Sequence, residues 1–503
     1  MSTSEIAPAG EQTLRTGTLR TIDAIAMAIA VLSPAMAMAY NTSGSAAFSG
    51  TSTPLAFLIG GIACLSLAVV VVGFTRRMAA AGYAYTYSSR ALGQNVGFLT
   101  GWMYAFGFFC FVPMTMSGVG GFTSTLIQTE IWKGAPSWIW FPIFLVGMAL
   151  LVALAVYDIK LSTRTLMVVA AVTIAIVVVV DLIVTFKGGK SGHTLQPFTF
   201  GHTLQGGFSG IFYGLIFGVT SFIGFETAAV LGEETRNPRR AIPLSVIVAV
   251  LFAIVFYVWT TYVIAIGVGV NDAGSKAWAG DPAVLATVAG NFAGHGFAIL
   301  VDIAAILSAF IVCTACATAA TRTMFAMGRE GVLPAWFGRT HPTRKTPANA
   351  ILFIAGAATV LAAVVGFFWS FGQGPYTNYF LFASIGTIAV TLVYVVLCAG
   401  GVAYFRRMRQ SYNPLAHLVV PIIGLVIFAL AIYGSIYSGA IPDWPYRIVP
   451  YANLAWLLAG VGLLLYLRSN RPDDVTRIGS ILGEEGGEEA AAVLDQSVPS
   501  TAM

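Results

Sequence analysis

The stretch Ser221-Phe222-Ile223-Gly224-Phe225-Glu226 places a glycine and a carboxylate inside an otherwise apolar segment, and the charged run Glu233-Glu234-Thr235-Arg236 follows shortly after it. A charged side chain near the centre of a bilayer costs about 2.5–3.5 kcal/mol or more. Ionisable groups at such depth usually serve a function. We therefore interpret Glu226 as a candidate functional residue.

The composition predicts a membrane protein. Hydrophobic residues make up 57% of the 503 residues and charged residues 9%, and the mean hydropathy is +0.82. These values exclude a water-soluble globular protein. Because a helix needs about 20 apolar residues to cross a bilayer, we predict an all-α integral membrane protein with twelve spans: 21–48, 54–75, 94–128, 137–157, 162–186, 207–232, 242–268, 294–328, 347–370, 376–404, 414–438 and 449–467.

The basic residues predict the orientation of these spans. With both termini in the cytoplasm, all 26 Lys and Arg residues fall on the cytoplasmic side except Lys133, Lys187, Lys190, Lys276 and Arg447. This asymmetry is typical of cytoplasmic loops. The net charge of +5 thus reflects membrane topology and gives no indication of nucleic-acid binding.

Two spans contain signals that break a helix. In the first, Ser33-Pro34 lies in mid-span, where proline removes an amide donor and displaces the carbonyl of Ala30. In the sixth, Thr220-Ser221, Gly224 and Glu226 interrupt an apolar helix. We interpret Tyr40 to Gly44, further along the first apolar run, as a turn.

Broken helices at matching positions of two halves are typical of transporters with an inverted repeat. We therefore divide the chain into a cytoplasmic segment 1–20, a first five-helix repeat 21–187, a second repeat 206–404, two further helices 414–467 and an acidic, disordered cytoplasmic tail 468–503. A broken helix can offer free amides to a carboxylate and free carbonyls to an ammonium group, which suits a zwitterion. The alternative is a pair of kinks without a ligand.

Three ordered motifs resemble the amino acid-polyamine-organocation family of permeases over roughly residues 20–467. The first is Gly224-Phe225-Glu226 with Glu233 to Pro243. The second is Ala81-Gly82-Tyr83-Ala84-Tyr85 with the stretch Arg90 to Trp102, and the third runs from Thr321-Arg322 to Pro347. The resemblance implies a LeuT-like fold and the transport of amino acids or amines by alternating access.

The resemblance also implies site residues. The substrate carboxylate would meet the unwound part of the first span, and the amino group the unwound part of the sixth; the residues concerned are Ser33, Pro34, Ala35, Met36, Ala37, Thr220, Ser221, Phe222, Ile223 and Gly224. Glu226 matches the family's intramembrane carboxylate, a candidate for coupling or gating. Glu233 and Glu234 match a charged stretch that can act as an inner gate or simply flank the membrane.

Departures from the family pattern leave the coupling ion open. Pro34 stands within Ser33 to Ala37 where many relatives have a Gly-Ser-Gly cluster, so neighbouring amides must bind the carboxylate. Thr220 occupies the place of a gating tryptophan found in some relatives with cationic substrates. Thr173 occupies the place of a lysine found in some proton-coupled relatives.

Other polar residues within the spans have two interpretations each. Asp302 either pairs with a second amine on a cationic substrate or is a hydrogen-bonded structural residue, whereas Asp181 is expected to face the exterior solvent. Ser308, Thr314 and Thr318 with the carbonyl of Ala30 form a possible sodium site, since hard cations prefer oxygen ligands, although such hydroxyls commonly bond to their own helix. We expect no cofactor.

The function predicted from the sequence is secondary active transport of an amino acid or related amine across the plasma membrane. Transport would be coupled to a proton or to exchange for a counter-substrate. The alternatives are a permease for polyamines or ethanolamine and a non-transporting sensor with the same fold. An enzyme would need a cluster of catalytic side chains at one depth, and the sequence offers none.

Overall fold

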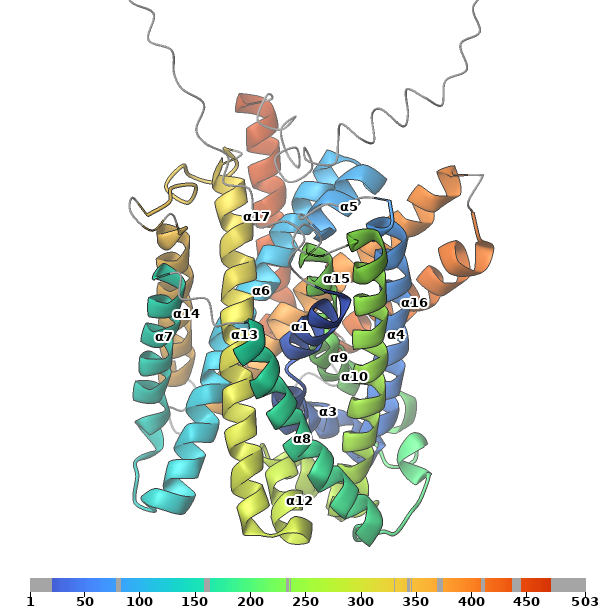
Figure 1. Ribbon diagram of the computed structural model, residues 1–503, viewed down its shortest axis with the longest axis vertical. Helices are drawn as coiled ribbons and strands as arrows, with labels where there is room; N and C mark the ends of the chain where they lie inside the picture. The colour runs from blue at the N-terminus through green and yellow to red at the C-terminus, as the bar shows by residue number, and fades with distance from the viewer. Residues whose placement is uncertain are drawn as a thin grey trace, which may run out of the picture.

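The computed structural model describes residues 20–77, 83–157, 163–231, 235, 237–329, 331–341, 344, 346–368, 374–408, 412–436 and 445–471. All elements within these ranges are helical (Figure 1). Within the described residues, eleven stretches are long and apolar enough to cross a membrane. The first of them, Thr21–Thr75, has 55 residues and contains two of the twelve predicted spans.

The first half of the chain follows the predicted spans closely. Its helices are α1 (Thr21–Leu32), α2 (Pro34–Met36), η1 (Ala37–Asn41), α3 (Thr42–Ser49), η2 (Gly50–Ser52), α4 (Thr53–Thr75), α5 (Tyr83–Leu92), α6 (Gln94–Leu126), η3 (Ile127–Ile131), η4 (Ser137–Ile139), α7 (Trp140–Val156), α8 (Thr163–Lys187) and η5 (Gln196–Phe198). The turn predicted at Tyr40 to Gly44 is wrong, because η1 and α3 carry the helix through these residues. Small polar residues are compatible with a helix when tertiary contacts bury them, as here.

The second half also begins with an interrupted span. Its helices are α9 (Gly207–Phe222), η6 (Phe225–Leu231), α10 (Pro238–Val268), α11 (Asp272–Gly280), α12 (Val284–Ala293), α13 (His295–Arg329), α14 (Ala348–Phe368), α15 (Gly374–Arg407), η8 (Leu415–Val419), α16 (Val420–Ile436), η9 (Tyr446–Ile448) and α17 (Val449–Asn470). The short helices α5, α11 and α12 were not predicted. They are too short or too polar to produce a membrane-span signal.

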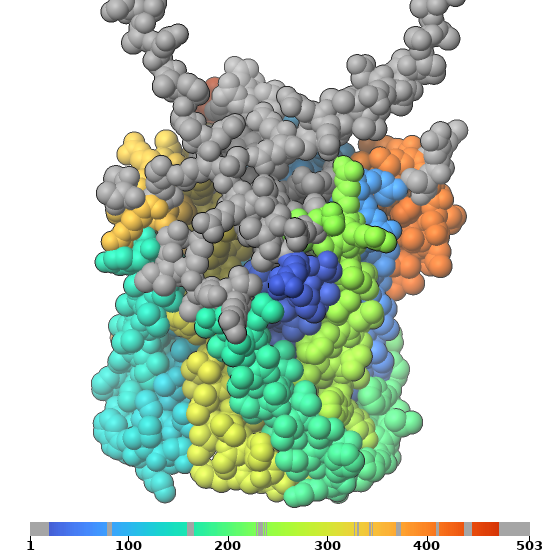
Figure 2. Space-filling view, viewed as in Figure 1, coloured from blue at the N-terminus to red at the C-terminus, as the bar shows by residue number. Residues whose placement is uncertain are grey.

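Helices far apart in sequence pack together around the broken spans. α6 packs against both α13 and α15, and α4 packs against α10. α1 lies between α8 and α10, where it forms part of the molecular surface (Figure 2). The outermost helices are α7 and α14 on one side of the bundle and α16 on the other (Figure 1).

The glycines at intervals of four in the sixth span form a close-packing seam, as small-residue faces do in lipid. A Cβ atom at Gly210 would lie 2.7 Å from the carbonyl oxygen of Phe48, and one at Gly214 would lie 2.8 Å from Ser45 Oγ. Gly218 faces the backbone of Ala56. α9 therefore contacts both α3 and α4 through its glycines.

The two ends of the bundle differ in charge. Arginines follow α4 and lie in the last turns of α15 and α17: Arg76, Arg77, Arg406, Arg407 and Arg468. We call this the basic end; it is uppermost in Figure 1, where α5 also lies. α11 and α12 lie at the opposite end (Figure 1).

Candidate functional site

The first span is broken at a single residue. Ser33 adopts a left-handed conformation (φ 50°, ψ 58°), and the helix restarts with Pro34 at its first position. A proline disfavours the right-handed helical conformation of the residue before it and is well suited to a first helical position. The predicted break is confirmed, but it is narrower than expected because Pro34 to Met38 are already helical.

Contacts with α13 hold this break. The Ser33 hydroxyl lies 2.6 Å from the carbonyl oxygen of Ser308, to which it donates, and 2.8 Å from Ser308 Oγ. The amide of Met36 donates to Ser308 Oγ at 3.3 Å. A left-handed residue other than glycine costs roughly 1–2 kcal/mol, and these bonds offset that cost. One of the first amides of the restarted helix thus already has a side-chain partner.

The sixth span is broken between α9 and η6. Ile223 is extended (ψ 131°), and Gly224 has φ +117°, which a residue with a side chain rarely adopts. This break is confirmed at Ile223-Gly224, whereas Thr220, Ser221 and Phe222 remain in α9. The expectation that those three residues are unwound is wrong, because α9 continues through Phe222. The hydroxyls of Thr220 and Ser221 donate to the carbonyls of Ile216 and Phe217 in the preceding turn.

The two breaks lie against each other. A Cβ atom at Gly224 would be 3.2 Å from Val31 Cγ1 and 3.3 Å from the carbonyl oxygen of Val31, in the last turn of α1. Tyr257 of α10 donates to the neighbouring carbonyl of Leu32 at 3.3 Å. The C-terminal ends of α1 and α9 therefore meet inside the bundle. They are 190 residues apart in sequence but lie within van der Waals distance of each other.

Glu226 is fully buried and holds the break in the sixth span. Its Oε2 accepts a hydrogen bond from the amide of Gly224 at 2.9 Å, and its Oε1 accepts one from the hydroxyl of Tyr394 in α15 at 2.7 Å. When the carboxyl group is ionised, such charge-assisted bonds are among the stronger hydrogen bonds in proteins. Tyr394 was not identified from the sequence.

Further polar pairs tie both broken spans to α15. Thr220 Oγ1 lies 2.7 Å from Thr387 Oγ1. Asn41 donates to Ser221 Oγ at 2.9 Å and accepts a hydrogen bond from the Tyr379 hydroxyl at 2.8 Å. Asn41, Tyr379 and Thr387 were missed because polar residues in these spans have no local pattern that identifies their partners.

Of the three hydroxyls proposed for a sodium site, that of Ser308 contacts Ser33 and Met36, and the other two bond within their own helix. Thr314 Oγ1 donates to the carbonyl of Ile311, and Thr318, which is exposed, donates to that of Thr314. The carbonyl of Ala30 is not displaced as expected but accepts the amide of Ser33 at 3.1 Å. Thr173 is buried in α8 and donates to the carbonyl of Ala170. No group of three or more His, Cys, Asp or Glu residues suited to a metal occurs in the described ranges.

The two aspartates have different environments. Asp181 is fully buried, and Oδ2 accepts a hydrogen bond from Thr260 Oγ1 at 2.6 Å, so the expectation that it faces exterior solvent is wrong. The reason is that α10 covers this face of α8. Asp302 is partly buried, and its Oδ1 has no hydrogen-bond partner among the described residues. Glu233 and Glu234 lie outside the described ranges.

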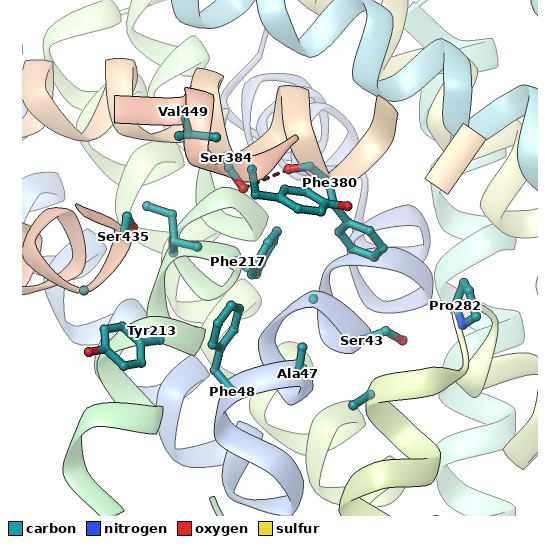
Figure 3. A pocket seen from close by; sticks show the side chains of 15 residues that line it. Ser43, Ala47, Phe48, Tyr213, Phe217, Pro282, Phe380, Ser384, Ser435 and Val449 are labelled. Carbon is teal, nitrogen blue, oxygen red and sulfur yellow. Dashed lines mark hydrogen bonds between the residues drawn. The ribbon is translucent and has the colours of Figure 1, made fainter. Parts of the chain in front are cut away.

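A pocket of about 240 Å³ lies beside α3 and α9, the parts of both broken spans that lead away from the basic end (Figure 3). It is lined mainly by apolar side chains from α3, α9, α15, α16 and α17, including Phe48, Tyr213, Phe217 and Phe380. None of the predicted substrate residues lines it. The pocket is therefore separate from the contact between the two breaks.

Comparison with known proteins agrees with this architecture. The family model described as amino acid permease matches residues 19–463. The branched-chain amino acid permease BcaP of Bacillus subtilis (strain 168) is 27% identical over 86% of this chain and 88% of its own length.

Other relatives carry different names. The low-affinity putrescine importer PlaP of Escherichia coli (strain K12) is 26% identical over 61% of this chain and 66% of its own length. The methylthioribose transporter of Bacillus subtilis (strain 168) is 26% identical over 59% of this chain and 64% of its own length. With eleven apolar stretches and a family match over nearly its whole length, the chain is a multi-pass membrane transporter that belongs to the amino acid permease family.

Proposed function

We propose that this protein carries an amino acid or a related amine across the plasma membrane by alternating access, with the substrate bound where the two broken spans meet. The observation that carries the proposal is the contact between Gly224 and Val31. Helix ends leave backbone amides and carbonyls without intrahelical partners. In a membrane, such groups persist only where protein or a cavity surrounds them.

Each pole of the substrate has a candidate partner. The restarted helix of the first span begins at Pro34; the amide of Met36 donates to Ser308 and that of Ala37 to the carbonyl of Ser33, so the amide of Ala35 is the partner we propose for the carboxylate. The carbonyl of Thr220 accepts the amide of Ile223, so the carbonyls of Ser221 and Phe222 at the end of α9 are the partners we propose for the ammonium group. Because both sets of groups are uncharged, they favour a substrate with no net charge, that is, a zwitterion.

Glu226 couples transport to a proton in this proposal. In its charged form, it accepts hydrogen bonds from Gly224 and Tyr394. A proton on Oε2 would turn this acceptor into a donor and displace the amide of Gly224. The break at Ile223-Gly224, which acts as the hinge of the sixth span, would then be free to move. Because Thr173 carries no charge where some proton-coupled relatives have a lysine, Glu226 is the group that takes the proton.

The topology in this proposal has twelve spans. Thr21–Thr75 crosses twice, the basic end faces the cytoplasm and each five-helix repeat begins with a broken span. The distribution of arginines supports this orientation.

A second candidate substrate class is a diamine or polyamine. Asp302 supports it, because Oδ1 is buried with no hydrogen-bond partner in the described part of the chain, and Asp281 and Glu130 add negative charge nearby. A second ammonium group would find a counter-charge at Asp302, as intramembrane carboxylates usually require.

Uptake by purified protein in proteoliposomes tests the proposal. Labelled neutral, acidic and cationic amino acids, putrescine and ethanolamine are supplied with and without an inward proton gradient. We expect concentrative uptake of a zwitterionic amino acid that depends on the gradient. Binding of an amino acid without any uptake or exchange would identify a sensor and overturn the proposal.

A further inference from the structure

A buried asparagine joins three helical segments on the far side of the breaks. Asn41 lies in η1, eight residues beyond the break at Ser33, and is 2% exposed. Its Nδ2 donates to Ser221 Oγ in the last turn of α9 at 2.9 Å. Its Oδ1 accepts a hydrogen bond from the hydroxyl of Tyr379 in α15 at 2.8 Å. The side-chain amide of Asn41 thus joins the continuing part of the first span to the sixth span and to α15. We call these two hydrogen bonds the link.

The partner from α15 is itself held by aromatic contacts. The ring of Tyr379 stacks on that of Tyr40, with centroids 4.3 Å apart and an interplanar angle of 16°. Tyr40 donates from its hydroxyl to the carbonyl of Gly118 at 2.5 Å and meets the ring of Phe122 edge-on at 4.0 Å. The link therefore extends to α6, and the hydroxyl of Tyr379 is fixed in direction.

The helix carrying Asn41 is irregular at this point. Residues Ala37–Asn41 form a π-helical turn, a geometry found frequently at functional sites. The extra residue in the turn rotates the following part of the span relative to a regular α-helix. Asn41 thereby faces Ser221 and Tyr379, while Tyr40 faces α6.

The pocket in Figure 3 lies directly beyond this link. Gly44, Phe217 and Phe380 line it, and each lies within four residues of Asn41, Ser221 or Tyr379. In both the first and the sixth span, the residues of the link lie between the break and the residues that line the pocket. The link therefore separates the pocket from the contact between the two breaks.

We propose that Asn41 is a positioning residue of the outer gate, a role that rests on the alternating access proposed above. Its two hydrogen bonds hold the outer parts of both broken spans against α15 and so close the path from the pocket to the substrate. Opening to the outside requires both bonds to break. Substrate entering from outside first occupies the pocket and reaches the breaks when Asn41 releases Ser221 and Tyr379.

Cysteine accessibility tests this gate without any substrate. Ile223, which is buried at the break in the sixth span and so lies on the inner side of the link, is replaced by cysteine, and a membrane-impermeant maleimide is added outside right-side-out vesicles. The five native cysteines are buried and serve as the background. We expect Asn41→Ala, which loses both hydrogen bonds, to raise the labelling rate about thirtyfold, because each bond of about 1 kcal/mol changes the population about fivefold.

Two further variants separate gating from packing. Tyr379→Phe removes one of the two bonds while keeping the ring on Tyr40, so it raises labelling less than Asn41→Ala. Asn453→Ala is the matched control, because Asn453 is also buried but donates to Val449 of its own helix. It lowers stability without changing labelling.

Unchanged labelling in Asn41→Ala and Tyr379→Phe overturns the gate, as does an equal rise in Asn453→Ala. If Asn41→Ala does not fold, Tyr379→Phe decides the question. Increased labelling in a protein that transports none of the tested substrates supports the gate while refuting the proposed transport. Measured transport together with unchanged labelling supports the proposed transport and refutes the gate.

Discussion

Glu226 accepts one hydrogen bond from the amide of Gly224, two positions before it, and another from the hydroxyl of Tyr394, 168 positions after it. The first bond joins it to the hinge at Gly224, and the second joins the hinge to α15. A change in the charge of one carboxylate therefore changes the contacts of two elements at once. This is the property expected of a coupling residue in a membrane interior.

Replacing Glu226 with glutamine tests this role. Gln keeps the size and one acceptor oxygen but takes up no proton at physiological pH. We expect Glu226→Gln to reduce proton-driven uptake to the level of empty liposomes while exchange of internal for external substrate persists. Tyr394→Phe is the matched variant, since it keeps the carboxylate and removes one donor, and it should retain gradient-dependent uptake at a lower rate. Full concentrative uptake by Glu226→Gln would show that the proton binds elsewhere.

We infer that Asp181 is a structural residue, because Thr260 is its hydrogen-bond partner among the described residues and both lie fully buried between α8 and α10. Removing one partner leaves the other buried without a hydrogen bond, at a cost of about 1–3 kcal/mol. We expect Asp181→Val and Thr260→Val each to lower the thermal unfolding midpoint in detergent, and the double variant to be less destabilised than the sum of the two. Additive shifts would mean that the two side chains do not act as a pair.

At the scale of the element, the break in the sixth span depends on Gly224. Its φ of +117° is costly for any other residue, and an added methyl group would press on the backbone of Val31. We expect Gly224→Ala to abolish uptake and to destabilise the protein by on the order of 1–3 kcal/mol. Gly290→Ala is the control, because its added Cβ atom makes only an ordinary contact with Ala298. Normal uptake by Gly224→Ala would show that the hinge conformation is not needed.

The elements predicted correctly are those with local signals. Proline after Ser33 and glycine at position 224 mark the breaks within the residues that form them, and hydropathy gives the long helices to within a few residues. Partners across the bundle have no such signal. The contacts of Asn41 with Ser221 and Tyr379 join residues 180 and 338 positions apart, and each of these residues alone looks like an ordinary polar group in a helix.

Burial explains the errors as well. Asp181 lies near the end of a span, a place where carboxylates commonly reach solvent, but the packing of α10 covers it. The polar run from Tyr40 to Gly44 resembles a turn, but the side-chain amide of Asn41 has partners in α9 and α15, and the Ser43 hydroxyl donates to the carbonyl of Asp281 just after α11. In both cases, tertiary contacts override a local preference.

At the scale of the whole molecule, the orientation of every span depends on whether Thr21–Thr75 crosses the membrane twice. At 55 residues, it is more than twice the length of about 20 residues that one crossing needs, and Gly50–Ser52 form a short 3-10 turn within it. Two crossings place the N-terminus and the arginines after α4 on the same side as the last turn of α15.

Labelling of single cysteines from one side of the membrane tests this arrangement. In right-side-out vesicles, we expect an impermeant maleimide to label Lys133→Cys and Lys276→Cys, which lie at the end opposite the arginines, and to label Arg339→Cys only after the membrane is permeabilised. A protease site fused to the N-terminus should be protected like Arg339→Cys, because two crossings in Thr21–Thr75 put them on one side. If the N-terminal site is cleaved in intact vesicles while Arg339→Cys stays protected, the segment crosses once. The two repeats would then share one orientation, and the inverted arrangement of the two broken spans would be lost.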